Sequence, residues 1–338
     1  MLSVVTGASG FLGGVLVREL LADEHRVRAV DLAPGPGLEA LDVEFVAADV
    51  LDRQSLDSAL EGASTVYHLA AVISVTGDPT GRVWTTNVDG VRNTALAALG
   101  AGVGRFVHCS SIHAYDTGAV KLVTEESPHA TSPHLPVYDR SKAAGEAALR
   151  EVISQGLDAV ICNPTAIIGP QDFAHSRMNA VLLTMFRRRL PALIEGGFDW
   201  VDVRDVGSSM IAAGLHGRTG ENYLLPGHHL TVRGLADVVQ RVTGVRKPAV
   251  TVPMWFARLW SPVADVAARR VDNPLWYTSE SLRALRCDPV VSGAKAGREL
   301  GHHPRPIDET IADMYGWAAG DTPSGPPPLA GTRRRAAG

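Results

Sequence analysis

The chain has 338 residues, of which 45% are hydrophobic and 20% charged, and its formal net charge is −4. This length accommodates one large α/β domain with a smaller second lobe, and the composition is that of a globular protein rather than a disordered one. The slightly acidic balance gives no basic face for nucleic acid and no polybasic patch for a membrane. We therefore expect a small-molecule substrate and no nucleic-acid partner.

The cysteines and the start of the chain indicate an intracellular protein. Cys109, Cys162 and Cys287 are odd in number and have no paired spacing, so neither a disulfide framework nor a metal site is expected. The N-terminus lacks the basic segment and apolar run of a signal peptide. The longest apolar stretch, 250–268, is interrupted by prolines and charges and falls short of the roughly 18 residues that span a bilayer. We expect a cytoplasmic location and no membrane span.

The first half of the chain alternates short apolar runs with longer amphipathic ones. Strands are predicted at 2–6, 26–31, 43–47, 65–69, 105–110 and 158–163. Helices are predicted at 10–22, 52–60, about 80–101 and 138–154. Such alternation is typical of βαβ units. The expected fold class is therefore α/β, with a Rossmann-type doubly wound parallel sheet.

The second half has a different pattern, because helical stretches dominate it. They are predicted at about 175–189, 203–216, 231–243, 255–271 and 292–300. We expect a dinucleotide-binding domain at 1–164, to which the chain returns at about 198–225. Segments 165–197 and 226–318 would form a smaller, mostly helical substrate lobe, and 319–338, rich in Pro, Gly and Arg, a disordered tail. The aromatic residues near 255–276 fit a core or, less simply, an apolar pocket.

A glycine trio follows the first predicted strand directly and opens the first helix. Gly7, Gly10 and Gly13 stand in the spacing TGxxGxxG. Glycine permits a tight turn and a close approach of the backbone to a pyrophosphate, which the helix N-terminus then binds. A purely structural glycine turn is the alternative, but the position at the first βα turn favours dinucleotide binding.

Asp31 ends the second predicted strand, at the offset expected for an acid that binds the adenosine ribose. A carboxylate there accepts hydrogen bonds from both ribose hydroxyls and repels a 2′-phosphate. The residues that follow, 32–34, include no arginine to receive that phosphate. The sequence therefore favours NAD over NADP, although use of NADP stays open, and Asp31 could also simply end a strand.

Two further motifs have the chemistry of an acid–base site. Tyr138 and Lys142 stand four residues apart in YDRSK, so on a helix they share one face. A nearby ammonium lowers the pKa of a tyrosine from about 10 towards a useful range. Ser110 and Ser111 close the strand at 105–110, where a hydroxyl can hydrogen-bond a reacting oxygen. Singly, each feature fits a core tyrosine or a turn; as an ordered set they indicate catalysis.

These motifs resemble the extended short-chain dehydrogenases/reductases, also called the NAD-dependent epimerase/dehydratase superfamily. The similarity runs from Leu2 to about Trp317, through TGASGFLG, HLAA, NVDGVRN, CSSIHAY, YDRSK and NPTAIIGP. The resemblance implies a catalytic set of Ser111, Tyr138 and Lys142, with Asn87 as the supporting asparagine. It implies cofactor contacts at Gly7, Gly10, Phe11, Leu12, Gly13, Asp31, Asp49, Val50, Leu69, Ala70, Ala71, Ser110, Tyr138, Lys142, Pro164 and Thr165. It also implies a homodimer.

The resemblance favours one branch of the superfamily. Nucleotide-sugar dehydratases have an acidic pair after the catalytic serine, where this chain has Ile112 and His113. Nucleotide-sugar epimerases have an arginine where this chain has Phe198. The segment VDVRDV at 201–206 is similar to the dihydroflavonol-reductase and hydroxysteroid-dehydrogenase-like branch. Asn163 points the other way, because sugar epimerases also place an asparagine before that proline.

We therefore expect an NAD(P)-dependent oxidoreductase that interconverts a secondary alcohol and a ketone or aldehyde on a small, non-nucleotide substrate. An NAD-dependent sugar epimerase and a non-catalytic dinucleotide-binding protein are the alternatives. Candidate substrate contacts are His113, Asn163, Phe173 and Arg177, although a lone histidine is more often structural.

Overall fold

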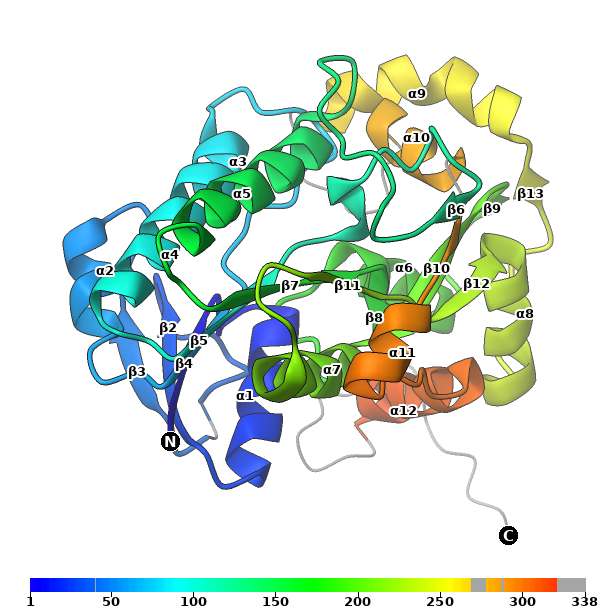
Figure 1. Ribbon diagram of the computed structural model, residues 1–338. Helices are drawn as coiled ribbons and strands as arrows, with labels where there is room; N and C mark the ends of the chain where they lie inside the picture. The colour runs from blue at the N-terminus through cyan, green and yellow to red at the C-terminus, as the bar shows by residue number, and fades with distance from the viewer. Residues whose placement is uncertain (40, 269–277, 287–288, 321–338) are drawn as a thin grey trace, which may run out of the picture.

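The computed structural model describes residues 1–39, 41–268, 278–286 and 289–320 (Figure 1). Seven parallel strands form its main sheet, in the order β11-β7-β5-β4-β1-β2-β3. These strands are β1 Leu2–Thr6, β2 Arg26–Asp31, β3 Glu44–Ala47, β4 Thr65–His68, β5 Arg105–Cys109, β7 Ala159–Pro164 and β11 Asn222–Leu225. The strand order reverses between β1 and β4, the point at which doubly wound sheets bind ligands. The predicted α/β class is confirmed.

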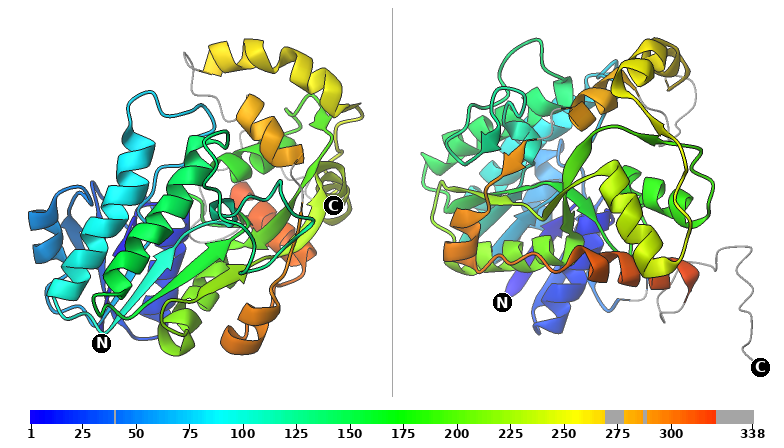
Figure 2. Two further views of the ribbon diagram at one scale, coloured as in Figure 1. Left: turned by 45° about the horizontal axis from the view of Figure 1, so that its top comes forward. Right: turned by 90° about the vertical axis from the view of Figure 1, so that its right-hand side faces the viewer.

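Helices cover both faces of the main sheet (Figures 1 and 2). One face is covered by α1 Phe11–Ala22 and α7 Val203–His216, whose apolar residues share one core with β1 and β7. The other face is covered by α2 Arg53–Ala59, α4 Gly90–Gly100 and α5 Val137–Ile153, which form a second core. Burial on both faces explains why the strands are apolar runs rather than alternating ones.

The helix predicted at 80–101 is present but interrupted. It consists of α3 Arg82–Trp84, a π-helical turn at Thr85–Asp89, and α4. The π turn sits where Asn87 faces α5, and Gly145 of α5 lies so close that a Cβ there would be 2.3 Å from the Asn87 carbonyl oxygen. Such turns occur often at functional sites. A change of hydrogen-bond pattern leaves the apolar spacing almost unchanged, so the sequence does not predict it.

The second lobe contains small sheets as well as helices, so it is less purely helical than expected. A three-stranded sheet has the order β12-β10-β8, and two strand pairs are β13-β9 and β14-β6. Its strands are β6 Leu122–Val123, β8 Ala166–Ile168, β9 Leu193–Ile194, β10 Gly197–Asp202, β12 His228–Thr231, β13 Thr251–Val252 and β14 Val290–Val291. Most of them are too short to show a periodic pattern. In the segment at 198–225, β11 joins the main sheet while β10 pairs with β8 and β12.

The helices of this lobe pack around a core of their own, except α11 Ala294–Leu300, whose Ala296 and Leu300 belong to the core shared by α1 and α7. The others are α6 Arg177–Phe186, α8 Val232–Thr243, α9 Met254–Ala268, α10 Ser279–Arg286 and α12 Ile307–Ala319. The sequence predicts α6, α8, α9 and α11 but neither α10 nor α12. The predicted end of the helix at 255–271 and residues 321–338 of the expected tail lie outside the described residues, while Ala319 still belongs to α12.

Three aromatic residues near the start of α9 correct a prediction. Trp255, Phe256 and Trp260 are exposed, although their spacing favours a core position. Across the described ranges, no helix has the length and hydropathy needed to cross a bilayer.

Candidate active site

The glycine loop after β1 has the shape of an anion cradle. Gly7 has a φ of +70°, and a Cβ there would lie 2.7 Å from the backbone nitrogen of Ala70. A Cβ on Gly13 would lie 2.2 Å from the Gly7 carbonyl oxygen. α1 begins without a side-chain cap, and the N–H groups of Phe11, Leu12 and Gly13 have no backbone acceptor among the described residues. Free N–H groups at the positive end of a helix fit the pyrophosphate of a dinucleotide.

Asp31 lies beside this loop at the end of β2. Its Oδ2 accepts a hydrogen bond from the Ser9 backbone N–H at 3.0 Å, and its Oδ1 accepts one from the Leu32 N–H at 2.8 Å. The carboxylate is thus held next to the anion cradle and keeps lone pairs for further donors. This placement fits the role of ribose ligand.

The other expected cofactor positions follow the ends of neighbouring strands. Asp49 and Val50 follow β3, Leu69 to Ala71 follow β4, and Thr165 follows β7. Because the carboxyl ends of parallel strands share one edge, the structure brings these positions to the same side of the sheet as Gly7 and Asp31.

Ser111, Tyr138 and Lys142 meet at this edge. Ser111 follows β5, and Tyr138 and Lys142 lie in the first two turns of α5. The Ser111 side chain lies near enough to the Tyr138 hydroxyl to lower its pKa. The Lys142 Nζ donates to the Cys109 carbonyl oxygen at 3.1 Å, so the lysine is tied to the end of β5. The three predicted catalytic residues are therefore neighbours.

The pKa of Tyr138 differs from the sequence-based expectation. Burial raises it above its usual value, and the nearby Ser111 side chain opposes this only in part. Burial lowers the pKa of Lys142, because it disfavours the charged form of the amine. The expected lowering of the tyrosine pKa by Lys142 is wrong, because the lysine donates to the Cys109 carbonyl oxygen and the tyrosine pKa is raised. Tyr138 is a neutral acid here.

Two buried histidines lie beneath Lys142. His68 and His108 are cross-strand neighbours on β4 and β5, with ring centroids 5.5 Å apart. Burial lowers both pKa values, that of His68 to about 3, and the Lys142 charge adds to the effect. Both imidazoles are therefore neutral, and the floor of the site carries no competing charge.

Asn87 links the loop after β4 to the catalytic helix. Its Oδ1 accepts from the Val72 N–H at 2.8 Å, and its Nδ2 donates to the Val72 carbonyl oxygen and to the Ser141 Oγ, both at 2.9 Å. Ser141 in turn donates to the Tyr138 carbonyl oxygen at 2.7 Å. Asn87 thus positions the backbone that carries Tyr138 rather than touching its hydroxyl.

His113 lies directly beside Tyr138. The two ring centroids are 5.7 Å apart in an edge-on arrangement, and the His113 Nδ1 is 3.1 Å from the Asp139 Oδ1. The predicted placement of His113 at the site is therefore consistent with its geometry.

Glu146 is a central residue that the sequence did not reveal. Its side chain is 1% exposed, and its Oε1 accepts from Ser110 Oγ at 2.5 Å and from Asn163 Nδ2 at 2.7 Å. Its Oε2 accepts from Asn222 Nδ2 at 2.9 Å and lies 3.2 Å from His129 Nε2. Burial raises its pKa, but these hydrogen bonds outweigh that effect and hold the pKa below its usual range. The one available signal was its position, one turn after Lys142 on the same helix face.

Asn163, expected at the substrate, belongs to this network. It is fully buried and donates to the Ser111 carbonyl oxygen at 3.0 Å as well as to Glu146. Its contacts favour a positioning role. Phe173 packs edge-on against Trp317 and beneath the Arg18 guanidinium, and Arg177 opens α6. Their substrate roles stay predictions.

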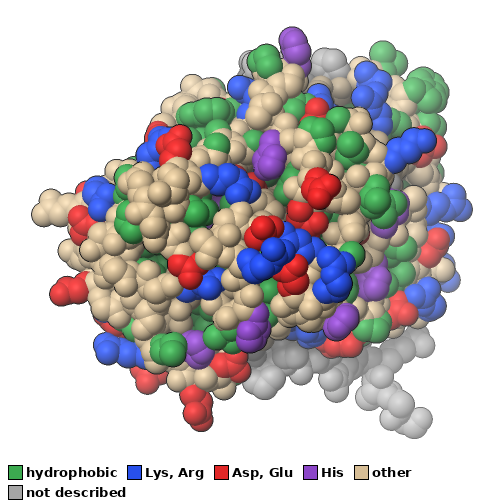
Figure 3. Space-filling model, in the orientation of Figure 1, with side chains coloured by type: hydrophobic (Ala, Val, Ile, Leu, Met, Phe, Trp, Pro, Cys, Tyr) green, Lys and Arg blue, Asp and Glu red, His purple; other side chains and the backbone are tan. Residues whose placement is uncertain are grey.

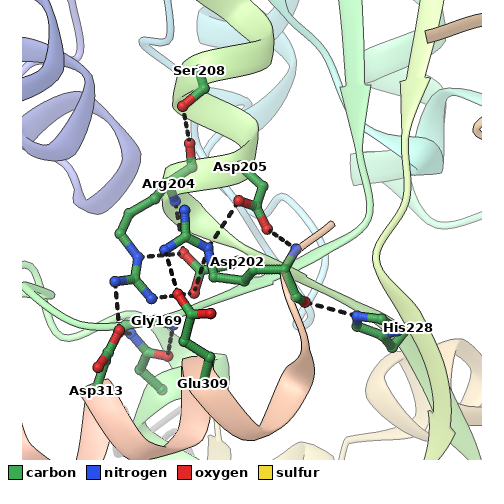
Figure 4. Close-up of polar contacts among 10 residues, drawn as sticks. Gly169, Asp202, Arg204, Asp205, Ser208, His228, Glu309 and Asp313 are labelled. Atoms are coloured by element: carbon green, nitrogen blue, oxygen red, sulfur yellow. Dashed lines mark hydrogen bonds and ion pairs between the residues drawn. The ribbon is translucent and has the colours of Figure 1, made fainter. Parts of the chain in front are cut away.

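The VDVRDV segment forms an ion-pair cluster at the start of α7 (Figure 4). Arg204 donates to Asp202 at 2.9 Å and to Asp313 of α12 at 2.6 Å. Arg305 donates to Asp205 at 2.9 Å. The cluster joins α7 to α12, so this motif stabilises the junction between the main sheet and the second lobe. No cluster suited to a metal ion occurs within the part of the chain that the structure describes.

The fold defines a Rossmann-type α/β protein, and comparisons with known proteins define its family. A model of the NAD dependent epimerase/dehydratase family matches residues 3–225. The chain belongs to this family, within the extended short-chain dehydrogenase/reductase superfamily, as its motifs predict.

Full-length relatives support this assignment. The chain is 34% identical over 329 residues to "Sterol demethylase protein B" of Methylococcus capsulatus, covering 94% of this chain and 98% of that protein. It is 28% identical to a "Putative dihydroflavonol 4-reductase" of Synechocystis, covering 93% of each. The crystal structure of gox2253 superposes with a TM-score of 0.80 at 30% identity, covering 95% of this chain and 98% of the other.

Proposed function

We propose that this chain is an NAD(H)-dependent oxidoreductase that interconverts a secondary alcohol and a ketone or aldehyde on a small, non-nucleotide substrate. The observation that carries the proposal is the proximity of Ser111 and Tyr138, with Lys142 on the same helix as the tyrosine, at the sheet edge that also holds the glycine cradle. A bound nicotinamide dinucleotide would supply the hydride or accept it.

Each side chain of the set has a role that its contacts allow. Tyr138 is the general acid in reduction, because burial keeps its hydroxyl protonated. Ser111 donates to the substrate oxygen and limits the build-up of charge on it. In the oxidation direction Tyr138 must give up its proton first. The positive charge of an oxidised nicotinamide ring would lower its pKa for this step.

Two sequence departures support a non-nucleotide substrate. Phe198 occupies the place of the epimerase arginine, and its ring packs edge-on against Trp200 at 5.3 Å. A phenyl ring at this position offers no charge to a diphosphate. Ile112 and His113 replace the acidic pair of the dehydratases. Because the names of two full-length relatives mention a sterol and a dihydroflavonol, ring-bearing apolar alcohols and ketones are the first substrates to test.

The cofactor preference follows from Asp31. Titration of the protein with NADH and with NADPH, followed by cofactor fluorescence, should show tighter binding of NADH. Asp31→Ala should weaken NADH binding by about tenfold, since it removes charge-assisted hydrogen bonds, and should leave NADPH binding equal or stronger. Tighter NADPH binding by the wild type would overturn the ribose role of Asp31.

The reaction itself is tested by NADH release from a panel of alcohols. Tyr138→Phe should abolish turnover while leaving NADH binding intact. Conversion of a sugar nucleotide without net NADH would indicate an epimerase. If the wild type and Tyr138→Phe both bind NADH and neither turns over any substrate, the chain is a non-catalytic dinucleotide-binding protein.

We also propose a cytoplasmic homodimer, built through the helices at 86–101 and 138–154. Sedimentation of the purified protein tests the oligomeric state directly.

A further inference from the structure

α9 presents an apolar face to the outside of the molecule. Its exposed residues include Trp255 at 69%, Leu259 at 67%, Trp260 at 58% and Phe256 at 42%. By the helical period these four lie on one face. Their rings form a continuous surface, because the Phe256 centroid lies 5.6 Å from that of Trp255 and 6.3 Å from that of Trp260. A patch of this kind on a helix marks an interaction surface.

The opposite face of α9 is the one that packs on the protein. Ser261 is buried, and its Oγ accepts a hydrogen bond from the Ser279 Oγ of α10 at 3.0 Å. α9 lies at the outer edge of the second lobe in every view (Figures 1 and 2). The aromatic face is therefore directed away from the core and away from the main sheet.

Basic residues lie in the segment that precedes α9, and Arg258 lies exposed within the helix. A hollow between α8 and the segment at 246–251 is lined by Arg233, Arg246 and Lys247, and no acidic residue lines it. Lys247 is paired with Asp237, but Arg233, Arg246 and Arg258 make no ion pair within the described part of the chain. Figure 3 shows apolar and basic side chains together at the upper right edge, where Figure 1 places α9 and β13. The net charge of −4 conceals this local positive surface.

We propose that α9 and the adjoining basic hollow form a docking surface for an anionic phospholipid bilayer. A helix with Trp, Phe and Leu on one face and arginines beside it lies in the plane of a membrane interface, with its rings among the acyl chains. The arginines then face the lipid phosphates. A second copy of the chain fits less well, because a two-fold contact through this face would bring the same unpaired arginines together. This surface is independent of the proposed catalytic activity.

Vesicle binding tests the proposal with the full chain. The protein should sediment with vesicles of equal parts phosphatidylcholine and phosphatidylglycerol, and several-fold less with phosphatidylcholine alone. Its tryptophan emission should shift to shorter wavelength on binding. The double variant Trp255→Ser/Leu259→Ser should bind at least about tenfold more weakly. The matched control is Leu215→Ser, which changes an exposed leucine of α7 and should bind like the wild type.

The basic hollow has its own variants. Arg233→Gln and Arg246→Gln should each weaken binding to the anionic vesicles about fivefold, whereas Arg298→Gln on α11 should not. Far-ultraviolet circular dichroism and NADH binding establish that each variant is folded. The proposal is overturned if the wild type binds neither vesicle or if the α9 variant binds as well as the wild type. It is also overturned if the protein binds inorganic phosphate at the hollow but does not bind vesicles. The same holds if the α9 variant loses a dimer and its vesicle binding is unchanged.

Discussion

Replacing Glu146 with glutamine removes a buried charge while it keeps the shape of the side chain. Each carboxylate oxygen faces two groups, Ser110 and Asn163 on one and Asn222 and His129 on the other, at 2.5 to 3.2 Å. An amide has one oxygen, so its NH2 group leaves two of these four groups without an acceptor. The substitution therefore disrupts half of the network directly.

The magnitude follows from the number of bonds lost. Hydrogen bonds to a charged group contribute about 1.5–3 kcal/mol each. Part of the loss of two is offset, because a neutral amide costs less to bury than a carboxylate. We expect Glu146→Gln to lower the free energy of unfolding by about 3 kcal/mol at pH 7. For a chain of this length that corresponds to a fall in Tm of about 4 °C.

The effect has a pH dependence with a defined sign. Hydrogen bonds hold the pKa of Glu146 in the folded chain below its unfolded value of about 4.3. Its stabilising contribution is therefore complete above the unfolded value and is lost as the pH falls through the folded one. The difference in stability between wild type and Glu146→Gln should narrow in acid.

Urea unfolding followed by circular dichroism, at pH 7 and near pH 4, measures this difference. Glu151→Gln is the matched control, because Glu151 lies on the same helix with its side chain 63% exposed and paired with Arg92. The control should change the unfolding free energy by less than about 0.5 kcal/mol. A Glu146→Gln variant as stable as this control at pH 7, or a difference that does not change with pH, would refute the reasoning.

Three further changes test other parts of the structure. Gly13→Ala should weaken NADH binding and lower Tm, because the new Cβ would lie 2.2 Å from the Gly7 carbonyl oxygen. The control Gly14→Ala should change neither quantity, since the nearest atom to its Cβ would be 3.4 Å away. Cofactor fluorescence measures the binding, and thermal unfolding measures Tm. Burial raises the pKa of Glu19 to about 8, so wild-type stability should decrease as pH rises from about 4.5 to 8, and Glu19→Gln should remove that decrease in urea unfolding at pH 5 and 9. Asn87→Ala should cost about 2–3 kcal/mol of stability and lower kcat more than it raises KM.

The parallel sheet and its helices were largely predictable because they are long and periodic. β1, β2 and α7 all have the predicted bounds. The strands of the second lobe were not predictable, since pairs such as β13-β9 contain two residues each. These residues form strands because they pair with a segment distant in sequence, and their local propensity does not predict this pairing.

The candidate site divides in the same way. Ser111, Tyr138 and Lys142 stand in local motifs, and the sequence predicts that they meet. Glu146 could not be assigned, because a glutamate within an alanine-rich helix usually faces solvent. Its burial depends on Asn163 and Asn222, which reach it only because β7 and β11 are neighbours in the sheet.

The buried amides explain how a site made from separate elements keeps its precision. Asn87 ties the loop after β4 to α5, and Asn163 ties β7 to the Ser111 backbone and to Glu146. When a catalytic hydroxyl shifts by about 1 Å, the rate of the catalysed reaction can fall about a hundredfold. A rigid network beneath Ser111 and Tyr138 therefore contributes to catalysis without touching substrate. If so, Asn163→Ala should lower kcat in the manner of Glu146→Gln, and the double variant should lose less than the sum of the two single changes, because both remove the same support.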